Sequence, residues 1–156
     1  DGIIELPATV YVQARLGSRR FLRMVDIQAS SLRELESVVR QALVHKVSAV
    51  NVLMHSHSFV RDGHGDARLL RRLDRFLAFL AREPGVQAVT TRAFHLRCQA
   101  DPTAAAATDA FEPHTGWWLS YLRTVESIGQ GWKNTVAALA PPLALATAGL
   151  LTYILL

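Results

Sequence analysis

Apolar residues recur every three or four positions in two stretches of the chain, which is the pattern of a helix with one buried face. The first stretch is residues 30–46, where Ser31 and Glu34 have the spacing of a capping box at a helix start. The second is residues 66–82, where leucine and phenylalanine lie opposite Arg68, Arg71, Arg72 and Arg75. We expect both helices to bury the apolar side, and we expect the arginine side to be solvated.

Shorter apolar runs predict strands. Residues 2–12 are rich in branched side chains, and we expect a strand that ends near Leu6 because Pro7 cannot donate a hydrogen bond to a sheet. The run AVNVLMH at 49–55 predicts a buried strand, and residues 86–89 predict another after a Pro-Gly turn.

A loop and a third helix complete this part of the chain. Residues 56–66 predict a loop because Gly63 and Gly65 break both periodicities. Thr90 or Thr91 has the place of a helix cap. Strands that alternate with helices predict βαβ units and a parallel sheet covered by helices. We therefore expect an α/β fold for residues 1–98.

The composition changes after residue 98. Residues 99–115 are rich in Ala, Thr, Asp and Pro, and they predict a linker. In residues 116–131, aromatic and aliphatic side chains recur at helical spacing, among them Trp117, Trp118 and Tyr121. This favours an amphipathic helix on a membrane surface, and a helix that packs on the preceding domain is the alternative.

Residues 132–156 predict a transmembrane helix. No charged residue follows Lys133, and a helix over residues 134–156 would be roughly 34 Å long, enough for a hydrocarbon core. Pro141 and Pro142 would kink this helix or begin it, and a buried helix of a soluble domain is the alternative. Small residues would allow close approach of a partner helix in the membrane, namely Ala144, Ala148 and Gly149.

The charge of the chain, its cysteine content and the motifs that it lacks restrict the possible binding partners and reactions. The net charge of +4 and the arginine content permit an anionic partner, and we rank a lipid surface before nucleic acid because nucleic-acid motifs are missing. A single cysteine, Cys98, excludes an internal disulfide. The sequence contains no phosphate-binding glycine loop, nucleophile elbow or Cys-x-x-Cys pair. We expect no nucleotide hydrolysis, serine esterase activity or thiol redox chemistry.

Two histidines follow the predicted strand at 49–55. On a strand, His55 and His57 would point to the same side, as two zinc ligands do, with Asp62, His64 or Asp66 nearby. This spacing is not specific to a metal site. Acid/base catalysis and simple hydrogen bonding at a strand end therefore stay open, and we assign no metal ligand within the chain.

Three segments suggest a family. GIIELPATV, VNVLMHSHSF and LDRFLAFLAREPGVQAVTTRAF follow one another within residues 2–96. This order resembles the C-terminal half of the polysaccharide deacetylases that have a NodB homology domain. The resemblance implies a partial (β/α) barrel, here followed by a C-terminal transmembrane helix. It also implies a hydrolase that removes acetyl groups from N-acetylated sugars with a divalent, zinc-type metal.

The resemblance also implies roles for individual residues. His55 matches the late histidine of the family's Leu-x-His motif, which acts as the general acid, and His57 and Phe59 would line the substrate pocket. The family has aspartate where this chain has Ser56. The early motifs, which hold the catalytic base and the metal ligands, have no counterpart here. We therefore expect the metal in a complete family domain and none bound by this chain alone.

Two functions follow as hypotheses. The first is the C-terminal portion of a bacterial membrane-anchored deacetylase, on the periplasmic face of the cytoplasmic membrane, with the lipid bilayer and acetylated polysaccharide as partners. The second is an inactive accessory or scaffold subunit that docks on a larger membrane protein complex through its transmembrane helix. Neither involves nucleic acid. The sequence leaves open whether the protein is an enzyme.

Overall fold

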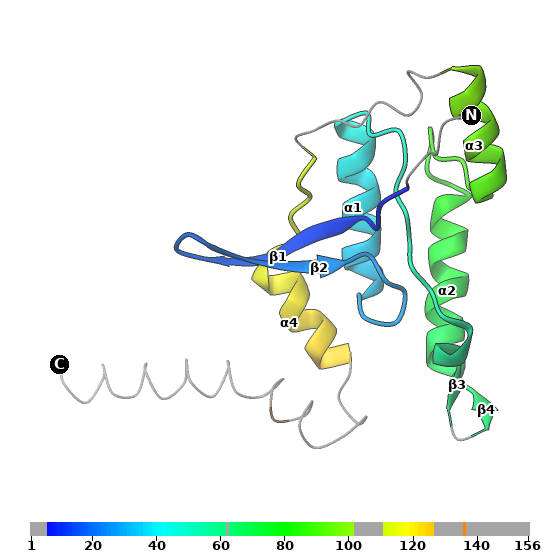
Figure 1. Ribbon diagram of the computed structural model, residues 1–156. Helices are drawn as coiled ribbons and strands as arrows, with labels where there is room; N and C mark the ends of the chain where they lie inside the picture. Colours follow the sequence, from blue (N-terminus) through cyan, green and yellow to red (C-terminus); the bar gives the residue numbers. More distant parts are fainter. Residues whose placement is uncertain (1–5, 62, 102–110, 127–135, 137–156) are drawn as a thin grey trace, which may run out of the picture.

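The computed structural model describes residues 6–61, 63–101, 111–126 and 136, and Figure 1 shows their arrangement. In chain order the elements are β1 (Val10–Leu16), β2 (Arg19–Met24), α1 (Leu32–Val44), the short 3-10 helix η1 (Ser56–Phe59), β3 (Val60–Arg61), β4 (His64–Gly65), α2 (Ala67–Leu80), α3 (Thr91–Ala100) and α4 (Gly116–Glu126).

An antiparallel hairpin of β1 and β2 forms the larger of two two-stranded sheets. The pairing runs from Val10 opposite Met24 to Leu16 opposite Arg19, with an irregularity between Val12 and Ala14. Gly17 has a φ of 58° in the turn, a left-handed conformation that glycine adopts without steric cost. The hairpin extends to one side of the molecule in Figure 1.

Parallel pairing occurs at two isolated bridges. Residues 25–27 lie beside Leu53, which donates its backbone N–H to the Val25 carbonyl at 2.8 Å and accepts from the Ile27 N–H at 3.1 Å. Val12 lies beside His114. The Val12 N–H donates to the Pro113 carbonyl at 2.8 Å, and the Val12 carbonyl accepts from the Thr115 N–H at 3.1 Å. The chain thus brings segments distant in sequence against the hairpin without building a regular parallel sheet from the described residues.

The two helix starts predicted from capping side chains, at Ser31 and at Thr90 or Thr91, are confirmed, and the structure adds a third cap at Asp66. Ser31 Oγ accepts from the backbone N–H of Glu34, and the Glu34 carboxylate accepts from the Ser31 N–H, which is a capping box. Asp66 accepts from two backbone N–H groups at the start of α2, and Thr90 accepts from Ala93 N–H at the start of α3.

The core lies between the hairpin, α1 and α2. In Figure 1 the two helices stand side by side, with the hairpin across α1. The buried core residues are Tyr11, Val25, Ile27, Leu35, Val38, Val39, Leu69 and Phe76. The buried residues of both helices belong to the predicted apolar sides, but Leu70 and Leu77, which the pattern also placed on the apolar side of α2, are exposed.

The predicted fold class, a partial (β/α) barrel with a parallel sheet, is wrong. The described sheets are both antiparallel and two-stranded. Residues 10–16 pair with residues 19–24 through a tight turn at Gly17. Residues 86–89, which were expected to form a strand, do not form one. Alternating apolar runs are compatible with parallel and antiparallel pairing, and here the turn at Gly17 makes the local antiparallel pairing possible. The strand after Pro7 begins only at Val10, and residues 1–5 lie outside the description.

The prediction of a single-pass membrane protein is also corrected. Among the described residues, no helix combines the length and the apolar character needed to cross a bilayer. The range predicted to span the membrane, 132–156, lies outside the described residues except for Val136.

The segment predicted as a linker ends against the fold. Of residues 99–115, those at 102–110 lie outside the description, whereas Pro113 and Thr115 are buried beside β1. The helix predicted at 116–131 is observed as α4 over its first part, and it packs on β1 and α1. Trp117 and Trp118 on α4 are exposed.

Candidate functional site

The two histidines singled out in the sequence lie together on the surface. His55 precedes η1 in an extended conformation, and His57 is the second residue of η1. Their rings stack with centroids 5.2 Å apart and an interplanar angle of 24°. Both side chains are exposed. The structure thus brings His55 and His57 together although residues 51–54 form only a bridge, because the turn of η1 returns the second ring toward the first.

The histidine pair follows the carboxyl end of a parallel bridge. Leu53 pairs with residues 25–27, and both chain segments leave this bridge in the same direction. Gln28 follows one segment, and His55 follows the other. In α/β proteins, ligands bind preferentially beyond the carboxyl ends of parallel strands. We name this region, formed by Gln28, His55, His57 and Ser58, the histidine edge.

Hydrogen bonds join the histidine edge to the 25–27 segment and to α2. Ser58 Oγ lies 2.7 Å from Gln28 Oε1 and donates to it, which links η1 to the end of the 25–27 segment. Arg72 of α2 donates from Nη1 to the carbonyls of Ile27 and Gln28, each at 3.0 Å. Gln28 and Ser58 were not singled out from the sequence, and Arg72 was expected only on a solvated side of a helix. No local pattern marks these contacts, because each joins positions at least thirty residues apart.

Phe59 has a different environment from the two histidines. Its side chain is half-buried and packs against the hydrophobic core. Its backbone carbonyl accepts from Asp66 N–H at 2.8 Å, which sets the start of α2. Core packing therefore accounts for this aromatic side chain, which was expected to line the substrate pocket.

The candidate metal ligands are not gathered into one group. Asp66 uses its carboxylate to cap α2, His64 is exposed on β4, and Asp62 lies outside the described residues. Within the described ranges, no three His, Cys, Asp or Glu side chains are placed so that they could share a metal ion. These residues do not fit the zinc-type metal of the deacetylases, and we derive no step through a metal.

A second polar cluster lies in the interior. Burial raises the pKa of Tyr11, whose hydroxyl lies 3.1 Å from Ser30 Oγ. Beside it, Glu34 is fully buried and its carboxylate lies 3.4 Å from Arg123 Nη1. Since Tyr11, Ser30 and Glu34 are inaccessible to solvent, this cluster joins elements of the fold and does not form a substrate site.

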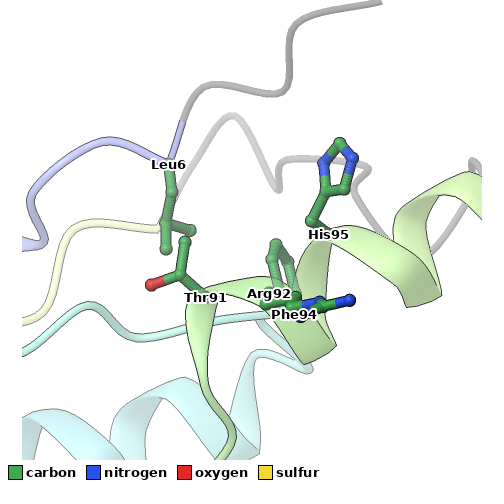
Figure 2. Close-up of a pocket in the computed structure, with 5 residues that line it drawn as sticks. All are labelled: Leu6, Thr91, Arg92, Phe94 and His95. Atoms are coloured by element: carbon green, nitrogen blue, oxygen red, sulfur yellow. The ribbon is translucent and has the colours of Figure 1, made fainter.

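A shallow cavity of about 190 Å³ lies elsewhere, at the start of α3. Figure 2 shows its lining residues, in which Leu6 lies above the first turn of the helix; they are Leu6, Thr91, Arg92, Phe94 and His95. None of them belongs to the histidine edge. Its polar groups are exposed or half-buried, so the cavity has no buried polar anchor for a ligand.

No protein-family model matches the chain, and neither a curated protein nor a solved structure is significantly similar. The histidine edge is therefore interpreted from its own geometry.

Proposed function

We propose that this chain supplies the general acid of a hydrolase that removes acetyl groups from N-acetylated sugars, and that His55 is that acid. The observation that supports the proposal most is the exposed pair of His55 and His57 directly after the carboxyl end of a parallel bridge. Exposure matters because an acid that protonates a leaving group has to reach a bound substrate. The resemblance of residues 2–96 to polysaccharide deacetylases suggests the substrate class.

The proposed step is a proton transfer. When the tetrahedral intermediate of amide hydrolysis collapses, the carbon–nitrogen bond breaks and the leaving nitrogen takes a proton from the imidazolium of His55. Acetate and a free amino sugar result, and His55 is left neutral. Histidine suits this role because imidazole exchanges protons near neutral pH. His57, stacked on His55, would bind a sugar hydroxyl and hold the first ring in place.

The reaction also requires a base that activates water. Within the described residues, no carboxylate makes an ion pair with His55 or His57. The base would come from residues outside this description or from a complementing chain. The proposal therefore concerns a contribution to an active site and not a complete one.

A non-catalytic accessory subunit is the second candidate, and one observation favours it. Leu22 and Met24 lie two positions apart on β2 and therefore on one face of the hairpin, and each exposes more than half of its surface. Contiguous exposed apolar side chains are typical of protein–protein interaction sites. An accessory role would use this face and would not require the histidines.

The test is a deacetylation assay on the full-length protein with N-acetylglucosamine oligomers, in which released amine is measured. We expect His55→Ala to lower kcat by about 100-fold or more, the contribution of a general acid. His64→Ala is the matched control, because His64 is also exposed and lies on β4. Equal rates for wild type and His55→Ala would refute the acid role. A wild-type protein that releases no amine would favour the accessory subunit.

A further inference from the structure

One flank of α2 is strongly basic. At about 100° per residue around a helix axis, its four arginines fall within a sector of about 100°. The apolar residues Leu69, Leu73 and Phe76 define the buried side of the same helix. Asp74, the acidic residue of α2, lies outside the sector. We name the group the arginine flank, formed by Arg68, Arg71, Arg72 and Arg75.

A fifth arginine extends this surface onto α1. The guanidinium of Arg40 lies 4.9 Å from the ring centroid of Phe79, which is one turn beyond Arg75 on α2. Arg40 also has two carboxylate neighbours, Glu36 at 3.8 Å and Glu83 at 3.7 Å. Arg40 thus continues the row of arginines, while these two glutamates offset its own charge.

Two members of the flank are free to bind a ligand. Arg71 and Arg75 are exposed, and no ion pair among the described residues involves them. Arg71 and Arg75 lie one turn apart on α2, so their like charges repel one another, and a bound anion would relieve this repulsion. Charge complementarity therefore points to an anionic ligand.

The arginine flank adjoins the histidine edge. Arg72 donates hydrogen bonds to the carbonyls of Ile27 and Gln28, and Gln28 accepts from Ser58 in η1. A chain-like ligand that lies along α2 would consequently reach His55 and His57. Arg68 and Arg75 are seven residues apart, or about 10.5 Å along the helix axis. This length exceeds that of one small anion and requires a ligand of at least two linked units.

We propose that the arginine flank binds a carboxylate-bearing polysaccharide and leads it to the histidine edge. The inference rests on the proposed function, because that function supplies the sugar. Arginine forms paired, parallel hydrogen bonds with carboxylates, and the chain contains fifteen arginines and two lysines. Single-stranded nucleic acid is the less suitable polyanion, because its recognition uses exposed aromatic rings and Phe79 is half-buried beside Arg40.

The test is calorimetric titration of the full chain with oligogalacturonate, an uncharged chito-oligosaccharide and a single-stranded DNA oligonucleotide. We expect oligogalacturonate to bind, and we expect its affinity to fall at least tenfold between about 50 mM and about 200 mM salt because screening weakens exposed charge pairs. The chito-oligosaccharide should bind at least tenfold more weakly. Tighter binding of DNA than of oligogalacturonate would overturn the proposal.

Paired variants locate the binding surface. Arg71→Gln with Arg75→Gln should lower the affinity for oligogalacturonate at least tenfold. Arg19→Gln with Arg92→Gln removes the same charge from exposed positions on β2 and α3, and it should change the affinity less than twofold. If both double variants lost the same affinity for oligogalacturonate, net charge alone would explain the binding, and the proposal would be overturned. Circular dichroism confirms that each variant is folded.

The two proposals fail in different ways. His55→Ala leaves the arginines intact, so oligogalacturonate should still bind to this variant, with a loss of affinity well below the tenfold loss expected for Arg71→Gln with Arg75→Gln. If deacetylation is insensitive to His55→Ala while binding persists, the proposed function fails, and the site binds an acidic glycan without that chemistry. If binding is absent while deacetylation still depends on His55, this inference fails alone.

Discussion

The Arg123 guanidinium lies 3.4 Å from Oε1 of Glu34, a glutamate whose side chain is fully buried. The other carboxylate oxygen of Glu34 accepts from the backbone N–H of Ser31 at 2.8 Å. One carboxylate therefore closes the capping box of α1 and holds α4 against it. Glu34 on α1 and Arg123 on α4 are 89 positions apart in the sequence, so this pair joins two helices that are distant along the chain.

Removal of this carboxylate should destabilise the fold. We expect Glu34→Ala to lower the free energy of unfolding by roughly 2 to 4 kcal/mol, because it leaves Arg123 without its partner in a largely buried place and opens the capping box. Urea denaturation monitored by circular dichroism measures the change. Glu36→Ala is the control, since its 3.8 Å pair with Arg40 is near the surface and should contribute about 0 to 1 kcal/mol. Similar losses in both variants would contradict a special role for the buried pair.

Neighbouring apolar positions on α2 should differ sharply. Phe76 is 2% exposed and belongs to the core, whereas Leu77 is 51% exposed. Phe76→Ala should cost about 3 to 5 kcal/mol through lost burial and a new cavity, and Leu77→Ala should cost less than about 1 kcal/mol. The midpoints of urea unfolding check this. If Leu77→Ala lowered the free energy of unfolding more than Phe76→Ala, then Leu77, and not Phe76, would lie on the buried side of α2.

Stability should decline at alkaline pH through Tyr11. Burial raises the pKa of Tyr11 above its ordinary value of about 10, so the folded state holds the phenolic proton more tightly than the unfolded state. The resulting stabilisation is fully present below about pH 10 and is lost as the pH rises through the raised pKa. As the pH is raised from 8 to about 11, wild type should therefore lose unfolding free energy relative to Tyr11→Phe. Parallel curves for the two proteins would argue against a buried, protonated Tyr11.

Cys98 should react slowly in the folded protein. Its side chain on α3 is buried and forms no disulfide. A thiol reagent such as dithionitrobenzoate needs an exposed thiolate, so labelling should be slow in buffer and rapid in concentrated urea. Absorbance of the released product follows the reaction. Equally fast labelling under both conditions would show that α3 does not cover this cysteine.

The sequence by itself determined the helices. Ser31 and Thr90 mark helix starts because a side-chain oxygen close in sequence satisfies the first backbone N–H groups. The spacing of leucines likewise determined which side of α1 and α2 is buried. The sequence also marked His55 and His57 as a pair, since two residues so close in sequence remain close in space.

Only the tertiary structure decided how the strands pair. An apolar run carries no information about its partner, so the hairpin of β1 and β2 and the bridge between Asp26 and Leu53 replaced the expected parallel sheet. The contacts of Gln28 with Ser58, and of Arg72 with Ile27, depend on that pairing as well. Such contacts form between segments that meet only after folding, and the pattern along the chain therefore cannot reveal them.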